Sequence, residues 1–190
     1  MTRPEPANVR RVAVIGTGVI GGGWAAHFLR QGLDVTVWDP APEAEDKLRE
    51  FIAGVWPRLE RLGLAEGADM RRLTFTATMA DAVRDAEFIQ ENAPERLETK
   101  RSVLAAIDSA APEWVVISSS TSGYAMTDMQ VKCDHPERTV VGHPFNPPYL
   151  IPLVEVVGGK ATDPAVVDWT VKFYNHFGKY GLKMTKELPG

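Results

Sequence analysis

The stretch that decides the fold is Arg11-Val12-Ala13-Val14-Ile15-Gly16-Thr17-Gly18-Val19-Ile20-Gly21. Its first five residues are mostly β-branched and apolar, which is typical of a buried strand. Small and apolar residues at 20–30 predict a helix that stops at Gly32, and residues 34–38 predict a second strand. Strand, glycine turn, helix and strand in this order indicate a βαβ unit with a right-handed crossover.

The glycine turn has the spacing of a dinucleotide-binding loop. Gly16 allows the tight turn, Gly18 lets the backbone approach a diphosphate, and Gly21 permits close packing of helix on strand. Amide groups at the helix N-terminus would then meet the negative diphosphate. Asp39, at the end of the second strand, is where a ribose-binding acid is expected. No arginine follows it directly, so NAD is favoured over NADP. A structural glycine turn and a methyltransferase cofactor loop are the alternatives.

Beyond this unit, strands alternate with helices. We expect strands at 73–78, 87–90, 114–118, 139–142, 153–157 and 179–184, and helices at 43–62 (interrupted at Pro57), 79–85, 95–109 and 164–177. The alternation predicts an α/β fold of the Rossmann type, doubly wound around a mostly parallel sheet, over residues 11–188. Residues 1–10 are expected to be a disordered lead-in. Pro189-Gly190 looks like the start of a connection to further polypeptide.

Composition limits the partners and the compartment. The chain has 190 residues and a formal net charge of -4, without a basic block, so neither nucleic acid nor an anionic membrane is an expected partner. A lone cysteine, Cys133, cannot form an internal disulfide, which favours a reducing compartment, and we expect a cytoplasmic location. We interpret Cys133 as a bystander in a polar loop. No metal site is expected.

A second functional pattern lies in the last third of the chain. Val141-Gly142-His143-Pro144-Phe145-Asn146-Pro147-Pro148 predicts a rigid loop after a strand, where ligands of open α/β sheets bind. Glu155 is a lone carboxylate in an otherwise apolar strand and needs a partner, for which His143 is the candidate. A histidine oriented by a glutamate can take the proton of a substrate hydroxyl while hydride leaves the same carbon. A loop histidine and an edge-strand charge without a catalytic role are the alternative interpretation.

Hydroxyl side chains gather at Ser118-Ser119-Ser120-Thr121-Ser122-Gly123, directly after a predicted strand. They are placed to bind substrate or the nicotinamide ribose. A turn or helix cap built by the same hydroxyls is equally consistent with the pattern.

Together these motifs carry a family resemblance. The glycine turn, Glu95-Arg96-Leu97 with Lys100, Ser-Thr-Ser-Gly at 120–123, His-Pro-Phe-Asn-Pro at 143–147 and Leu-Val-Glu-Val-Val at 153–157 resemble the NAD-binding domain of the L-3-hydroxyacyl-CoA dehydrogenase family. The resemblance covers nearly the whole chain after residue 10. Within the family, the chain looks most like the members that act on carnitine.

The resemblance implies a role for each matching residue. His143 matches the catalytic base, Glu155 its orienting partner, Ser122 a serine that contacts substrate and cofactor, and Asn146 the asparagine of the His-x-x-Asn-Pro motif. Those four form the expected catalytic set. The expected NAD-binding set is Gly16, Thr17, Gly18, Val19, Ile20, Gly21, Asp39, Glu95, Lys100 and Ser120.

Two departures from the family bear on the substrate. Members that bind coenzyme A carry polar and basic residues on the helix after the ribose acid, where this chain has Val55 and Leu62. A small 3-hydroxy acid is therefore expected, with oxidation of L-carnitine to 3-dehydrocarnitine as the best candidate. A 3-hydroxyacyl-CoA dehydrogenase and a non-catalytic NAD-binding or structural protein are the alternatives.

The second departure is the family's C-terminal helical domain, which supplies a further catalytic asparagine and the dimer contact and which we do not find in this sequence. We therefore expect the full-length protein to be a homodimer through that domain, and this chain alone to catalyse poorly.

Overall fold

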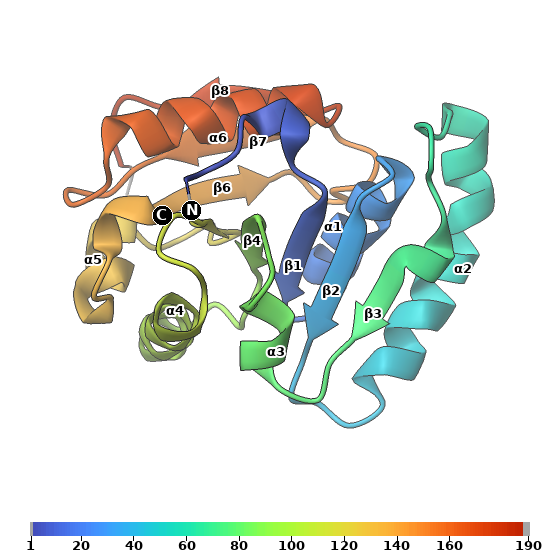
Figure 1. Cartoon of the computed structure of the whole chain (residues 1–190), viewed down its shortest axis with the longest axis horizontal. Helices are drawn as coiled ribbons and strands as arrows, with labels where there is room; N and C mark the ends of the chain where they lie inside the picture. Colours follow the sequence, from blue (N-terminus) through green and yellow to red (C-terminus); the bar gives the residue numbers. More distant parts are fainter. Residues whose placement is uncertain (1, 188–190) are drawn as a thin grey trace.

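The computed structural model describes residues 2–187, so the connection expected at Pro189-Gly190 lies outside the described residues. Eight strands form one sheet in the order β3-β2-β1-β4-β5-β6-β7-β8 (Figure 1). Their bounds are β1 Arg11–Ile15, β2 Asp34–Trp38, β3 Leu73–Phe75, β4 Phe88–Glu91, β5 Val116–Ser119, β6 Thr139–Pro144, β7 Leu153–Val157 and β8 Tyr180–Lys183. Every neighbouring pair is parallel except β6 with β7. The predicted doubly wound, mostly parallel fold is confirmed.

Helices cover both faces of the sheet. They are α1 Val19–Arg30, α2 Ala44–Leu62, α3 Met79–Val83, α4 Leu97–Ala110, α5 Met126–Met129 and α6 Pro164–His176, with 3-10 turns η1 Pro6–Asn8, η2 Met70–Arg72, η3 Gln130–Lys132 and η4 Pro136–Arg138. One hydrophobic core joins α1, α2 and α6 to the sheet, and a second core joins α3, α4 and α5 to its other face. Because strand order reverses between β1 and β4, the ligand crevice is expected at the carboxyl ends of these two strands.

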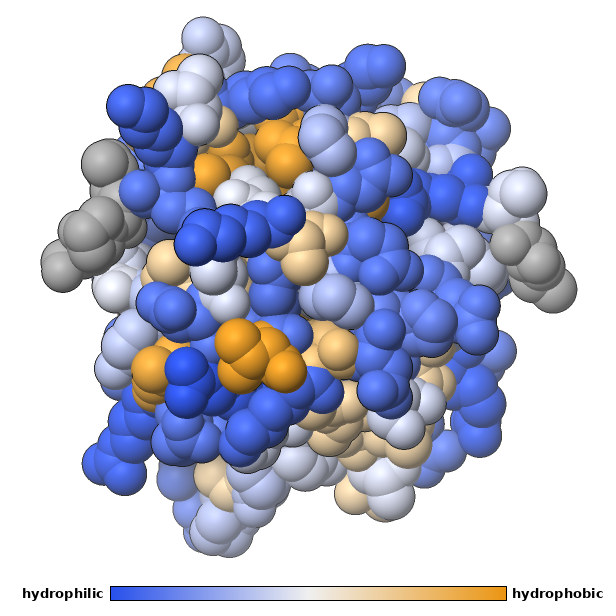
Figure 2. Space-filling view, turned by 90° about the vertical axis from the view of Figure 1, so that its left-hand side faces the viewer, coloured by the Kyte–Doolittle hydropathy of each residue, from blue (hydrophilic) through white to orange (hydrophobic). Residues whose placement is uncertain are grey.

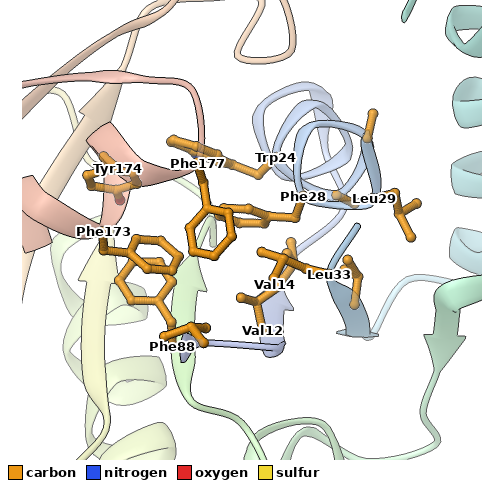
Figure 3. Close-up of a cluster of buried hydrophobic side chains, with 14 of the residues drawn as sticks. Val12, Val14, Trp24, Phe28, Leu29, Leu33, Phe88, Phe173, Tyr174 and Phe177 are labelled. Atoms are coloured by element: carbon orange, nitrogen blue, oxygen red, sulfur yellow. The ribbon is translucent and has the colours of Figure 1, made fainter. Parts of the chain in front are cut away.

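An aromatic cluster ties α6 to α1 and to the sheet (Figure 3). The rings of Phe28 and Trp24 stack with centroids 5.2 Å apart, and those of Phe88 and Phe173 with centroids 4.0 Å apart. All four side chains are completely buried. Burial of each large apolar side chain contributes about 1.5–3 kcal/mol. The cluster therefore fixes α6, and with it the start of β8, against α1, the helix that follows the glycine turn.

The segment before β1 is ordered, so the expectation of a disordered lead-in is wrong for residues 2–10. Nε of Arg3 donates to the carbonyl of Trp114 at 3.0 Å, and Nε1 of Trp169 donates to the carbonyl of Pro4 at 2.8 Å. Val9 is completely buried in the first core. Both hydrogen bonds join residues more than a hundred positions apart, so the sequence of the segment itself does not indicate them.

The helix α2 is continuous through Pro57, where an interruption was expected. Its buried residues Leu48, Ile52, Trp56 and Leu59 recur at helical spacing and pack into the first core. Pro57 itself is exposed, on the solvent side of the helix. The apolar face holds the helix together where one backbone hydrogen bond is missing.

The surface over the α5 side of the sheet is mainly hydrophilic, and its hydrophobic areas are small and separate (Figure 2). Within residues 2–187, no helix combines the length and the apolar character that a membrane crossing requires.

The contact between Gly21 and Gly16 gives a test of the fold. A Cβ at Gly21 would overlap the carbonyl oxygen of Gly16, whereas a Cβ at Gly54, in α2, would meet nothing within 4 Å. We expect Gly21→Ala to lower the free energy of unfolding by about 1–3 kcal/mol and to abolish NAD binding. Gly54→Ala, the matched control, should raise that free energy by about 0.5–1 kcal/mol. Urea unfolding and NAD titration measure both. Equal stability of the two variants would contradict the close packing.

Candidate active site

The carboxyl ends of β1, β2 and β4 enclose a cavity of about 460 Å³. Gly16, Gly18, Asp39 and Asn92 are among the residues that line it. Gly16 has φ +90°, which an L side chain rarely adopts, and a Cβ there would meet the backbone of Asn92. Gly18 has nothing within 4 Å of the position a Cβ would occupy, so its backbone is open to a ligand. The residues present therefore fit the adenosine and diphosphate half of a dinucleotide.

Asp39 is held in place by the glycine turn itself. Its Oδ2 accepts from the amide of Thr17 at 2.7 Å and from the hydroxyl of Thr17 at 3.0 Å, while Oδ1 accepts from the amide of Ala41 at 2.8 Å. A carboxylate has about four lone-pair sites, so acceptor capacity remains for ribose hydroxyls. The Thr17 side chain thus orients the acid. Val19, 71% exposed, turns outward from the same loop.

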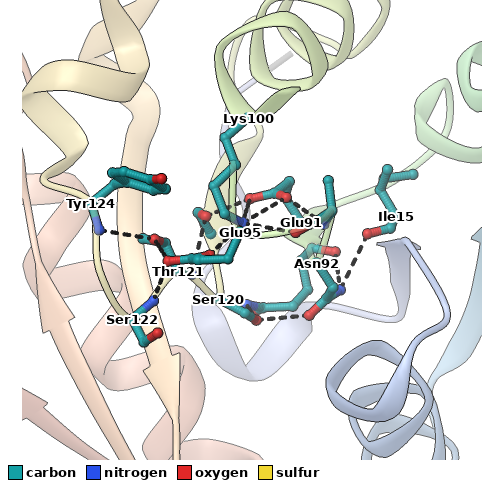
Figure 4. Close-up of polar contacts among 12 residues, drawn as sticks. Ile15, Glu91, Asn92, Glu95, Lys100, Ser120, Thr121, Ser122 and Tyr124 are labelled. Carbon is teal, nitrogen blue, oxygen red and sulfur yellow. Dashed lines mark hydrogen bonds and ion pairs between the residues drawn. The ribbon is translucent and has the colours of Figure 1, made fainter. Parts of the chain in front are cut away.

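A buried charge cluster lies under the next part of the crevice (Figure 4). Nζ of Lys100 lies 3.1 Å from Oε1 of Glu91 and 3.4 Å from Oε2 of Glu95. Lys100 and Glu91 are almost completely buried. The hydroxyl of Ser119 also donates to Glu91. A lysine in the first turn of α4 opposes the helix dipole, so the two carboxylates stabilise its charge there.

Glu95 in turn holds the serine-rich loop. Its Oε1 accepts from the hydroxyl of Thr121 and from the amides of Ser122 and Gly123, at 2.5, 3.0 and 2.9 Å. Burial by itself would raise the pKa of Glu95, but these hydrogen bonds and the charge of Lys100 lower the pKa below its usual value. Glu95 therefore stays ionised and fixes the loop. Glu95, Lys100 and Ser122 line one cavity together with Ile20 and Ser120.

Ser120 differs from its expected role in one respect. Its hydroxyl donates to Oδ1 of Asn92 at 2.7 Å and accepts from Nε1 of Trp24 at 3.1 Å and from Nε2 of Gln90 at 2.8 Å. One donor and two acceptor sites are all that a serine hydroxyl has. Ser120 lines the cavity, but its hydroxyl is already fully bonded within the protein.

His143 and Glu155 are brought together by strand pairing. The two residues are directly opposed in the antiparallel register of β6 with β7, and Nδ1 of His143 lies 3.0 Å from Oε2 of Glu155. His143 lies within β6, where a loop position was expected, because β6 extends to Pro144. The side chains are 27% and 34% exposed, so Glu155 is only partly buried. The bond occupies Nδ1 and leaves Nε2 for a ligand.

A cavity of about 300 Å³ opens on this pair. It is lined by Thr121, Ser122, Tyr124, Ala125, Val141, His143, Glu155, Val157, Met184, Lys186 and Glu187. A smaller neighbouring cavity is shared by Ile20, Ser122, His143, Phe145 and Asn146. Ser122 lines this cavity, the larger one beside Glu155 and the one beside Lys100. The crevice therefore runs from Asp39 to His143 and brings the expected cofactor and catalytic residues to one edge of the sheet.

The chain as a whole matches the family described as 3-hydroxyacyl-CoA dehydrogenase, NAD binding domain, over residues 11–188. It belongs to this family. The NAD-binding domain and the expected cofactor are thereby confirmed, and the methyltransferase alternative is wrong.

Curated relatives and solved structures agree with this assignment. The chain is 63% identical to an L-carnitine dehydrogenase of Streptomyces griseus subsp. griseus and 62% identical to one of Streptomyces coelicolor. These matches cover 97% and 100% of the chain but only 55% and 59% of the two relatives. A solved structure of 5-formyl-3-hydroxy-2-methylpyridine 4-carboxylic acid 5-dehydrogenase, an NAD+-dependent dismutase, is 34% identical, with a TM-score of 0.89 over 96% of this chain and 59% of that one.

Several residues that line or support the crevice were not predicted from the sequence. Glu91 is the last residue of β4, and Asn92 directly follows it. Polar residues at the carboxyl end of a buried strand could have indicated that both belong to the site. Lys179 gave no such signal, because its partners, the carbonyls of Pro148 and Ile151, come from a distant segment.

The buried charge cluster generates a stability prediction. Lys100→Met leaves the carboxylate of Glu91 buried without its cation, so we expect the free energy of unfolding to fall by about 3–5 kcal/mol. Lys132→Met, the matched control, removes an exposed lysine that pairs with Glu98, and should change stability little. Urea unfolding of both variants measures the difference. A loss at Lys100 no larger than that at Lys132 would show that the cluster contributes little.

Proposed function

We propose that the full-length protein oxidises the 3-hydroxyl of L-carnitine to a ketone, giving 3-dehydrocarnitine, with NAD as the oxidant. The observation that carries the proposal is the His143–Glu155 pair, which opens on a cavity at the end of the NAD crevice. The substrate is taken from the relatives named L-carnitine dehydrogenase. Oxidation of a 3-hydroxyacyl-CoA is less favoured, because Val55 packs against the core and Leu62 offers no polar group to coenzyme A.

The geometry supports a division of roles within the pair. Nε2 of His143 accepts the proton of the substrate hydroxyl as the carbon–hydrogen bond at C3 breaks. The imidazolium that results is stabilised by the carboxylate of Glu155, which also holds the ring in position. NAD, when bound, supplies the acceptor for the hydride that leaves C3. Ser122 and Asn146 are proposed to hold the substrate and cofactor, since both line the space beside His143.

Carnitine carries a carboxylate and a quaternary ammonium, and the catalytic cavity has groups suited to each. Lys186 lines this cavity and could pair with the carboxylate of carnitine. Tyr124 lines it as well, and its aromatic ring could hold the quaternary ammonium. Phe145, 38% exposed near His143, is a second candidate for the ammonium. Tyr149 does not suit this role, because its ring packs edge-on against Phe51 with centroids 5.8 Å apart.

A homodimer formed through a helical domain and a cytoplasmic location are further parts of this proposal. The matching relatives are longer than the chain, which leaves room for such a domain in them. Size-exclusion chromatography with light scattering of the full-length protein measures the first, and subcellular fractionation the second.

A substrate comparison tests the proposed function. With NAD, the full-length protein is expected to oxidise L-carnitine with a kcat/KM on the order of 10²-fold above that for a 3-hydroxybutyryl-CoA substrate, because a site lacking polar partners for one ligand rejects it. NADH formation measures both rates. The reverse preference would establish the acyl-CoA alternative, and no turnover of either would favour the non-catalytic alternative.

A second test addresses the base. His143→Asn removes the proton acceptor but none of the residues around Asp39, so turnover should fall by about 10²–10⁴-fold while the Kd for NAD stays near that of the wild type. His176→Asn is the matched control, since His176 is an exposed histidine at the end of α6. Initial rates and NAD titration give both quantities. Turnover retained in His143→Asn would remove His143 from the mechanism.

A further inference from the structure

A lysine that the proposed mechanism does not use lies buried behind the catalytic loop. We define this loop as residues 145–152, which join β6, carrying His143, to β7, carrying Glu155. Nζ of Lys179 donates to the carbonyl of Ile151 at 3.0 Å and to the carbonyl of Pro148. The residue is only 7% exposed. It makes no ion pair with any carboxylate in residues 2–187.

The composition of the loop explains why it needs donors from outside. Its three prolines, Pro147, Pro148 and Pro152, have no backbone N–H. The amides of Leu150 and Ile151 both donate to the single carbonyl of Pro147. A buried carbonyl without a donor is costly, and an ammonium supplies three donors and no acceptor. Lys179 therefore supplies hydrogen bonds that the loop cannot make for itself.

Further contacts connect this lysine to the cofactor side. Nζ lies 5.0 Å from the ring centroid of Trp24, whose Nε1 donates to Ser120 in the crevice. Pro148 lies so close to Gly23 that a Cβ on that glycine would be 2.7 Å from Cδ of the proline. The loop thus packs against α1, and the ammonium contacts both the loop and the Trp24 ring of that helix. A shift of the loop would move the strand ends that carry the catalytic pair.

We propose that Lys179 is a positioning residue, whose buried ammonium holds the 145–152 loop and thereby sets the geometry of His143 and Asn146 against the NAD crevice. The inference rests on the proposed function for its kinetic consequence, but the hold on the loop stands on contacts alone. A displacement of about 1 Å at a reacting group can reduce a rate roughly 10²-fold, so a positioning residue remote from substrate can matter this much.

The charge of Lys179 is sensitive to pH near neutrality. Burial, and then the positive charge of Arg30, lower the pKa of Lys179 to about 7. The other titratable neighbour on α1 is His27, whose own pKa is lowered by burial and by the charge of Lys179, so that the imidazole stays neutral. Charged donors make roughly twice as strong a hydrogen bond as neutral ones. The hold on the loop should therefore weaken as pH rises through about 7.

The same titration of Lys179 affects the stability of the whole fold in the opposite direction to its hold on the loop. Above about pH 7 the folded protein releases the proton of Lys179, whereas the unfolded chain keeps it up to the ordinary lysine pKa of 10.5. The unfolded state then binds more protons, and this group makes the fold more stable as pH rises across that window. If Lys179 acted only through the stability of the fold, kcat/KM would not fall over the pH range in which the free energy of unfolding rises.

The kinetic test compares Lys179→Met with wild type, both full-length, on the hydroxy acid that the wild type oxidises best. The ratio of their kcat/KM values cancels the pH effects that the two proteins share. We expect a ratio of roughly 10–10² at about pH 6 and a smaller one at about pH 9, because the neutral amine of the wild type keeps its N–H donors but makes weaker hydrogen bonds, with the Kd for NAD nearly unchanged. Lys183→Met replaces an exposed lysine at the end of β8, the strand that directly follows Lys179, and should give a ratio near unity at both pH values. A ratio near unity at about pH 6 would overturn the inference.

A second measurement does not depend on activity. Hydrogen–deuterium exchange of the peptide spanning 145–151, compared between Lys179→Met and wild type at the same pH, should show faster exchange in the variant at about pH 6 and a smaller difference at about pH 9. Unchanged exchange at about pH 6 would overturn the inference even if turnover fell. If the wild type oxidises no hydroxy acid but the exchange difference appears, the proposed function fails while the role of Lys179 as the loop's donor stands.

Discussion

The rest of the structure depends on the approach of α1 to the ends of β1 and β4. This approach is possible only because Gly21 has no side chain to meet the carbonyl of Gly16. Once the helix lies there, its first turn points at the point where strand order reverses, and Asp39 is close enough to bond the amide of Thr17. The position of the cofactor crevice is thus a consequence of one steric constraint.

The one antiparallel pair in the described sheet has a comparable effect on the catalytic end. In β6 and β7, opposed residues project their side chains on the same face, so a histidine and a glutamate in register meet without any loop having to place them. A slip by one residue would turn Glu155 to the opposite face. The loop between the strands must therefore keep a fixed length and path, and its prolines restrict the path of the backbone.

Local sequence patterns were enough to predict the features that depend on local chemistry. The glycine turn, the alternation of strands and helices, and the pairing of His143 with Glu155 each follow from spacing or from the need of a lone carboxylate for a partner. Features that depend on distant contacts were missed. Residues 2–10 are ordered by Trp114 and Trp169, and the continuity of α2 at Pro57 comes from the core that its apolar face meets. Propensity gave the wrong result in both places because tertiary packing outweighs it.

The two buried lysines show how differently the fold uses the same side chain. Lys100 lies between Glu91 and Glu95, so its charge is compensated and the cluster is held rigidly under the crevice. Lys179 has carbonyl dipoles and the Trp24 ring in place of a carboxylate, and the pKa of its ammonium falls to about 7. An apolar side chain there would avoid the desolvation of a charge, but it would leave the carbonyls of Pro148 and Ile151 without donors. The fold thus accepts a poorly compensated charge at the position where a proline-rich loop cannot supply its own hydrogen bonds.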